Sequence, residues 1–199
     1  MVVFETSSGA PRSFPMNAGL TATEMGDALI AAAAEFGLLG DYDRSKFDDD
    51  DDRPYDPDDA LGLFQALVTA EGVLAIHRSR IGGNTGPIQL WPHGFDLAFE
   101  WFGTRMVATS DMAESSEVPA QINLGLYPAG DAYFYSNPWP FDADSLLAVE
   151  LPDGAGWHTD GWEGSTLAYS DVAGAPGGPE RVLAYARAVF DAAATDLTD

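Results

Sequence analysis

Two histidines and two aspartates lie in two short, aromatic-rich stretches of the sequence. His93 and Asp96 belong to the first stretch, and His158 and Asp160 belong to the second. Two imidazoles with one or two carboxylates form a set that can bind zinc, manganese or iron. Their spacing matches no known metal motif, so no cofactor is assigned. A metal-dependent enzyme that uses both histidines with one of the two aspartates remains an alternative hypothesis.

Asp96 and Glu100 are four residues apart and share one parity of a predicted strand. At about 3.3 Å per residue they lie about 13 Å apart, which is too far for a general acid and base that act as a pair. Each carboxylate can instead pair with an acid from another strand, or Arg80 and Arg105 can neutralise them.

Three tryptophans lie on proline- and glycine-rich segments, where core packing explains them least. Aromatic side chains around a few polar groups are typical of small-molecule sites. Our leading hypothesis is therefore a pocket, both aromatic and acidic, that binds a small organic ligand. A third hypothesis is a structural or oligomerisation module whose aromatics form a protein interface, and it leaves a homo-oligomer open. The predicted pocket residues are His93, Asp96, Trp139, Trp157, His158, Asp160 and Trp162.

Composition restricts the partners and the chemistry. Nine basic and 32 acidic residues give a net charge of −23, which argues against nucleic acid or an anionic membrane as a partner. The chain has no cysteine, which excludes disulfides and thiol catalysis. No signal peptide is recognised, and no uncharged apolar run approaches the roughly 18 residues of a membrane span. We expect a cytoplasmic protein.

The central predicted element is the strand that carries Asp96. Phe95, Leu97, Phe99 and Trp101 share one parity, and the two carboxylates alternate with them. This pattern indicates one face in a core and acids on the other. We expect Gly103 to end the strand and residues 110–117 to form a loop or one helical turn.

Three helices are predicted. Thr21 and Glu24 form a capping box before a helix that Gly37 ends. Asp56 and Pro57 begin a second helix that runs to about Ser79. Its leucines and phenylalanine cover much of its circumference, so we expect it to be central. A third helix begins at Pro179, and we expect its buried stripe to consist of Val182, Ala186, Val189 and Ala193.

The remaining strands indicate an α+β fold, with an antiparallel sheet packed against about three helices. Residues 121–126 and 132–136 are predicted hairpin partners, and 145–151 and 165–172 are further strands. We expect an N-terminal hairpin at 1–20 and a single domain at 21–199. Within that domain, residues 41–56 form an exposed acidic loop in which five consecutive aspartates repel one another.

Two segments carry a resemblance to a known family. Gly86–Asp96 reads GPIQLWPHGFD, and Asn123–Asp131 reads NLGLYPAGD before a tyrosine-rich return. Together they resemble a bacterial family without assigned function, domain of unknown function family 5996. The resemblance covers most of the chain from about Thr21 onward. Val2–Met16 is similar to the last hairpin of the β-rich N-terminal region in longer members, and the resemblance implies that this chain lacks the strands before it.

The sequence departs from that family pattern at one position. Related segments place a histidine directly before the phenylalanine, whereas here Gly94 precedes Phe95 and the histidine is His93. Asp96 matches the pattern. The resemblance therefore implies an architecture and no mechanism.

Overall fold

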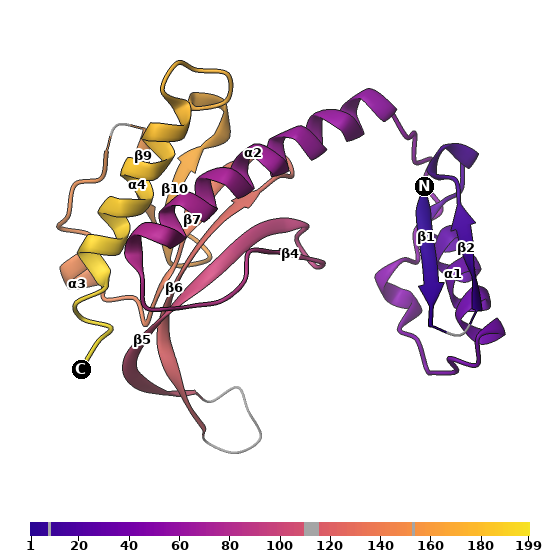
Figure 1. The fold of residues 1–199 in the computed structure, drawn as a ribbon, viewed down its shortest axis with the longest axis horizontal. Helices are drawn as coiled ribbons and strands as arrows, with labels where there is room; N and C mark the ends of the chain where they lie inside the picture. Colours follow the sequence, from indigo (N-terminus) through magenta and orange to yellow (C-terminus); the bar gives the residue numbers. More distant parts are fainter. Residues whose placement is uncertain (8, 110–115, 153) are drawn as a thin grey trace. The chain divides into compact units, whose positions relative to one another are not determined.

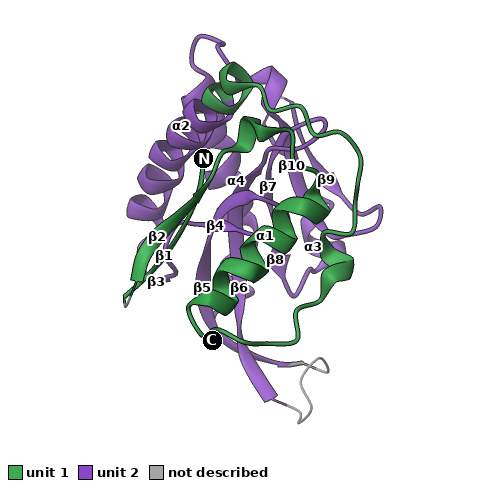
Figure 2. Cartoon of the chain, turned by 90° about the vertical axis from the view of Figure 1, so that its right-hand side faces the viewer, with its two compact units in different colours: residues 1–62 green, residues 63–199 purple. Residues whose placement is uncertain are grey.

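The structure is a computed structural model that describes residues 1–7, 9–109, 116–152 and 154–199. The chain forms two compact units, Met1–Gly62 and Leu63–Asp199, coloured separately in Figure 2. The first unit includes the N-terminal hairpin, the first helix and the acidic segment. The boundary between the units therefore falls at Gly62, whereas the sequence suggested a boundary after residue 20.

The first unit is a hairpin packed on a helix. Strands β1 (Val2–Thr6) and β2 (Gly9–Phe14) pair antiparallel, and a short 3-10 helix, η1 (Met16–Ala18), leads to helix α1 (Ala22–Glu35). The predicted capping box is present, since Glu24 N donates to Thr21 Oγ1 at 3.2 Å and Thr21 N donates to the Glu24 carboxylate at 3.0 Å. Phe4 stacks on Phe36 with ring centroids 5.5 Å apart, which joins the hairpin to the end of α1.

The acidic segment is anchored on α1. Its only helical turn is the 3-10 helix η2 (Arg44–Lys46). The ring of Phe47 lies against Gly26, where a Cβ atom would come within 2.3 Å of it. Asp49 N donates to Thr23 Oγ1 at 3.0 Å, and Arg53 pairs with the Asp49 carboxylate at 2.5 Å. The aspartate run is therefore held at Asp49, although the aspartates beside it are exposed.

Helix α2 (Pro57–Ile81) begins where the sequence predicts, because the Asp56 carboxylate accepts from Asp58 N at 2.8 Å. The expectation of a helix buried on most sides is wrong for its first half, where Leu61, Phe64 and Val68 are exposed. The buried residues lie in the second half: Ala70, Val73, Leu74 and His77.

By length and composition α2 is also the one helix in the described ranges that is long and apolar enough to cross a membrane. The core helix of a soluble protein can have the same composition but is mostly buried, whereas 22% of the apolar window of α2 is buried. The four buried residues of α2 belong to the hydrophobic core of the second unit or contact it.

The second unit is built on an eight-stranded antiparallel sheet with the order β3-β5-β6-β7-β10-β9, in which β4 also pairs with β5 and β8 with β6. Figure 1 shows the long β5–β6 ribbon at its centre. The strands are β3 (Asn84–Thr85), β4 (Gln89–Trp91), β5 (Asp96–Thr109), β6 (Ser116–Tyr127), β7 (Tyr133–Ser136), β8 (Pro138–Trp139), β9 (Ala155–His158) and β10 (Gly164–Ala168).

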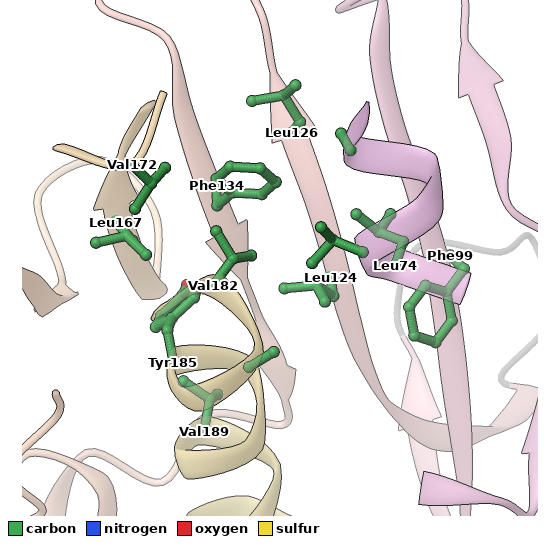
Figure 3. Close-up of a cluster of buried hydrophobic side chains, with 13 residues drawn as sticks. Leu74, Phe99, Leu124, Leu126, Phe134, Leu167, Val172, Val182, Tyr185 and Val189 are labelled. Atoms are coloured by element: carbon green, nitrogen blue, oxygen red, sulfur yellow. The ribbon is translucent and has the colours of Figure 1, made fainter. Parts of the chain in front are cut away.

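One face of this sheet is covered by α2 and by helix α4 (Gly178–Ala193). Register places the apolar residues of neighbouring strands together, as in Phe99 opposite Leu124 and Leu126 opposite Phe134. Leu74 of α2 and Tyr185 of α4 pack on them (Figure 3). The predicted stripe of the last helix is confirmed, since Val182, Ala186, Val189 and Ala193 are buried. Together with the sheet these helices confirm the α+β class.

Gly103 does not end β5 as predicted. The strand continues to Thr109, with an irregular pairing between Phe102 and Met106. A Cβ atom at Gly103 would lie 2.0 Å from the carbonyl oxygen of Leu197, and Arg105 N donates to that oxygen at 3.2 Å. The glycine therefore permits the C-terminal segment to pass against β5. Of the predicted loop at 110–117, residues 110–115 lie outside the described residues, and Ser116 begins β6.

The strand predicted at 145–151 is also wrong. Helix α3 (Ala143–Leu146) begins there, because the Asp142 carboxylate accepts from Asp144 N and Ser145 N. The strand predicted at 165–172 is shorter than expected. It ends at Ala168, and the 3-10 helix η3 (Tyr169–Asp171) follows it.

Candidate functional site

The candidate site lies on the face of the sheet opposite α2 and α4. Successive side chains of a strand point to opposite faces of the sheet. Because Phe99 faces the helices, Ala98 and Glu100 lie on the other face. Pairing then extends these positions across the sheet in rows. One row runs from Ala98 through Gly125, Tyr135 and Thr166 to Gly156. The rows beside it contain Asp96, Tyr127 and Tyr133 on one side, and Glu100, Asn123 and His158 on the other.

Tyr135 is the centre of this face. Its ring lies over Gly125, where a Cβ atom would come within 2.6 Å of the ring carbon that carries the hydroxyl. Glycine at this position therefore lets the side chain lean across the neighbouring strand. The phenol hydroxyl then reaches β5 and donates a hydrogen bond to Oδ2 of Asp96.

A hollow of about 240 Å³ opens beside this pair. Asp96, on its floor, is only 7% exposed. The turn between β4 and β5 supplies His93 and Gly94, and Asn137 and Trp162 complete the rim. The full lining consists of His93, Gly94, Asp96, Tyr127, Tyr133, Tyr135, Asn137 and Trp162.

Aromatic rings form most of the wall. The ring centroids of Tyr127 and Tyr133 are 5.3 Å apart, and Tyr133 lies nearly parallel to Trp162 at 6.4 Å. The imidazole of His158 stacks on the indole of Trp162, with ring centroids 4.3 Å apart. Nδ1 of His158 lies 3.0 Å from the carbonyl oxygen of Trp162. These contacts hold the β9–β10 turn against the sheet.

Two further contacts fix that turn. Asn137 Nδ2 donates to the carbonyl oxygen of Glu163 at 2.8 Å. Gly164 has no side chain to obstruct the indole, because a Cβ atom there would lie 2.6 Å from the Trp162 ring. Trp162 is therefore placed by packing and by backbone contacts on both sides of it.

The site is acidic and contains neutral phenols. Burial, with a smaller contribution from the negative charge of Asp96, raises the pKa of Glu100. Burial and the hydrogen bond to Asp96 raise the pKa of Tyr135, and burial raises that of Tyr133. Both tyrosines therefore keep their hydroxyl protons at neutral pH, and Tyr135 donates its proton to Asp96.

Asp96 has no positively charged partner among the residues that the structure describes. The four ion pairs of that part of the chain involve Arg12, Arg44, Arg53 and Arg187, and none reaches the site. Arg105, which the sequence suggested as a partner, donates to the carbonyl oxygen of Asp196 at 3.0 Å. The lining of the hollow contains neither lysine nor arginine.

A second hollow of about 350 Å³ adjoins the first, because Tyr133 and Trp162 line both. Its other lining residues are Asp131, His158, Thr166 and Ala168. The stacked rings of Tyr133 and Trp162 are thus shared between the two hollows.

The structure brings some of the sequence-predicted residues together and separates others. His93, Asp96 and Trp162 line the first hollow, and His158 lines the second. Trp139, Trp157 and Asp160 line neither. Trp157 packs on the core, its ring 5.8 Å from that of Phe141, and its Nε1 donates to the carbonyl oxygen of Val149 at 2.9 Å. Trp139 pairs in β8 with Gln121, and Asp160 is exposed.

The residues proposed as metal ligands do not gather. Across the described ranges, no three histidine or acidic side chains are close enough to hold one metal ion. His93 is exposed in the β4–β5 turn, with its ring 6.4 Å from that of Trp91. The imidazole of His158 is stacked on Trp162 and bonded to its backbone. The two histidines therefore belong to separate hollows.

Sequence reasoning missed Tyr127, Tyr133, Tyr135 and Asn137 as pocket residues. The available signal was the predicted hairpin of residues 121–126 and 132–136. Its strand alternation places Tyr133 and Tyr135 on one face and Phe134 on the other. With Phe134 assigned to the core, the two tyrosines fall on the face that carries Asp96.

Comparison with known proteins adds a family and no activity. The model of a family of unknown function, DUF5996, matches residues 1–198. The match takes in the N-terminal hairpin as well as the sheet. No curated protein and no solved structure matches the chain.

Proposed function

The chain belongs to the family of unknown function DUF5996, and we propose that it binds a small organic ligand in the hollow beside Asp96. The observation that carries the proposal is the buried carboxylate at the floor of an aromatic-walled hollow. Few convergent polar groups in an aromatic surround are the usual composition of small-molecule sites. Asp96 is 7% exposed and lies among Tyr127, Tyr133, Tyr135 and Trp162.

The contact between Tyr135 and Asp96 supports binding more than packing alone. Burying a carboxylate costs free energy, so an apolar side chain would fill the same space with a smaller loss of stability. The sheet instead has Gly125 beneath the Tyr135 ring, which is what allows Tyr135 to reach Asp96. The arrangement thus keeps a charged acceptor in a fixed position at the hollow.

The proposal is tested by fragment screening with amide and indole NMR. A library with neutral, anionic and cationic fragments is added to the full chain, and the indole signal of each tryptophan is assigned with Trp→Phe variants. We expect bound fragments to shift the signal of Trp162. The signal of Trp139, which lies outside both hollows, serves as the control and is expected to stay in place.

A library in which no fragment shifts the Trp162 signal would overturn the proposal. A second contrary result is a Trp162 signal that moves with protein concentration alone. That result indicates that the aromatic face contacts another copy of the chain, as the interface hypothesis requires.

A further inference from the structure

We infer that the ligand of this hollow carries an organic ammonium group, which binds beside Asp96 and among the rings of Tyr133 and Trp162. This inference rests on the proposed function and names the chemical class of the ligand. It follows from the charge of the site, the chemistry of its walls and its size.

Within the described residues, no cationic side chain pairs with the carboxylate of Asp96. Buried charges in proteins are normally paired with an opposite charge, because an isolated ion loses its hydration without compensation. Tyr135 gives Asp96 one hydrogen bond from a neutral phenol. No other donor and no cationic side chain reaches this carboxylate within the described part of the chain. A ligand cation would supply the missing charge.

The walls have the chemistry that binds such a cation. The face of a tyrosine or tryptophan ring carries negative electrostatic potential and attracts an ammonium group within about 6 Å of the ring centre. Tyr127, Tyr133 and Trp162 form a connected series, with neighbouring centroids 5.3 and 6.4 Å apart. An anionic ligand would meet Asp96, with no lysine or arginine in the lining.

An organic cation fits better than a metal ion. A divalent metal needs several oxygen or nitrogen ligands around one point. Among the described residues no group of three such side chains exists, whereas one carboxylate with several aromatic rings suits an ammonium group. The hollow of about 240 Å³ is also smaller than the roughly 300–1,000 Å³ of sites for drug-sized ligands. It therefore suits a small head group.

The test compares a cation with its neutral isostere. Choline and 3,3-dimethylbutan-1-ol have the same shape, and a carbon atom replaces the charged nitrogen in the second. We expect choline to bind about tenfold more tightly in calorimetric or NMR titrations at constant ionic strength, because only choline has the charge that the rings and Asp96 attract. Tetramethylammonium and methylammonium are titrated in parallel to cover quaternary and primary ammonium groups.

Two variants connect the preference to the site. Asp96→Asn is expected to weaken binding of the ammonium probes about tenfold and to leave the weaker binding of the neutral isostere unchanged. Asp160→Asn removes the same charge from an exposed position outside both hollows and controls for the net charge of −23. Trp162→Leu removes one aromatic wall and is the second site variant if Asp96→Asn does not fold.

Equal affinity for choline and its isostere would overturn the inference, as would the absence of binding by every ammonium probe at millimolar concentrations. An equal loss in Asp96→Asn and Asp160→Asn would also overturn it, since it would show attraction by net charge alone. These failures differ from failure of the proposed function. If neutral fragments still shift the Trp162 signal, the hollow binds a ligand and only the cation assignment is withdrawn.

Discussion

The two faces of the sheet in the second unit are built from the same strands and differ in nearly every physical property. The face toward α2 and α4 contains the buried residues Phe99, Leu124, Leu126 and Phe134. The opposite face carries a carboxylate, phenols and small residues, and it is hollowed. Consecutive residues of β5 separate these roles, since Phe99 belongs to the core and Glu100 to the other face.

The difference shows where this chain uses its glycines. On the covered face, close packing is achieved with large apolar side chains, such as Tyr185 and Phe99, that are almost fully buried. On the face that carries the hollow, here called the open face, Gly125 and Gly164 leave the space that the rings of Tyr135 and Trp162 occupy. The first face provides the stability, and the second arranges a few side chains around a hollow.

The largest effect that we predict is on the covered face. Phe99→Ala removes a fully buried ring and leaves a cavity among Leu74, Leu124 and His77, so we expect the free energy of unfolding to fall by about 3–5 kcal/mol. Urea unfolding measures this change. The matched substitution on the open face is Glu100→Ala, for which we expect a change of less than about 1 kcal/mol. Equal losses would show that the two faces do not differ in their contribution to stability.

The covered face should also exclude charge, and His77 tests this. Its ring is 4% exposed and lies 6.3 Å from that of Phe99 and 6.2 Å from that of Phe190. Burial, followed by the positive charges of Arg187 and Arg80, lowers the pKa of His77 from 6.5 to about 4, and Asp191 opposes this. Between these values the unfolded chain binds a proton that the folded chain does not. Stability therefore falls as the pH is lowered from 6.5 toward 4, by about 3 kcal/mol in total.

The measurement is the difference in unfolding free energy between pH 7 and about pH 4, compared for the wild type and His77→Phe. The carboxylates titrate alike in both proteins. The contribution of His77 is therefore the difference between the changes in unfolding free energy that the two proteins show over this pH range. We expect the variant to lose less stability on acidification. Identical changes in the two proteins would show that His77 is protonated equally in the folded and unfolded chains.

Local signals in the sequence were sufficient for the elements that hold these faces. The capping box at Thr21 and the Asp56–Pro57 start each involve residues within a few positions, and both helices begin as predicted. The alternation also identified the core side of β5 for Leu97, Phe99 and Trp101, whereas Phe95 precedes the strand and is 50% exposed. These features depend on backbone hydrogen bonds and side-chain periodicity, which a single segment determines.

Several failures involve contacts between distant segments, whereas the missed helix α3 has a local cap at Asp142. Glycine often ends a strand, which is why Gly103 was predicted to do so. Its lack of a side chain instead lets the carbonyl oxygen of Leu197, far along the chain, lie against β5. Trp157 lies in a glycine-rich segment, but it joins a core that its sequence neighbours do not reveal. The pocket depended on strand register, which brings Asp96 and Tyr135 together across β6. Residue types alone do not determine how strands pair. The predicted pocket set therefore included core residues as well as residues that line the hollow.

Adding one methyl group beneath Tyr135 tests the packing on the face that carries the hollow. In Gly125→Ala the new Cβ would overlap the Tyr135 ring, so the ring must move and its hydrogen bond to Asp96 is lost. We expect a loss of about 2–3 kcal/mol, from strain together with the broken bond. Gly156→Ala is the control in the same row, because a Cβ there meets no atom within 4 Å. Equal effects of the two substitutions would contradict the role assigned to Gly125.

The smallest effect isolates the hydroxyl group from the ring. Tyr135→Phe keeps the ring over Gly125 and removes the donor to Asp96, so we expect a loss of about 1–2 kcal/mol in urea unfolding. Tyr133→Phe is the matched control, because the hydroxyl of Tyr133 makes no hydrogen bond with any described residue, and its removal should change stability by less than about 0.5 kcal/mol. A Tyr135→Phe protein as stable as the control would mean that water replaces the phenol at Asp96. The open face would then differ from the covered one in shape and charge, without a hydrogen bond that the fold depends on.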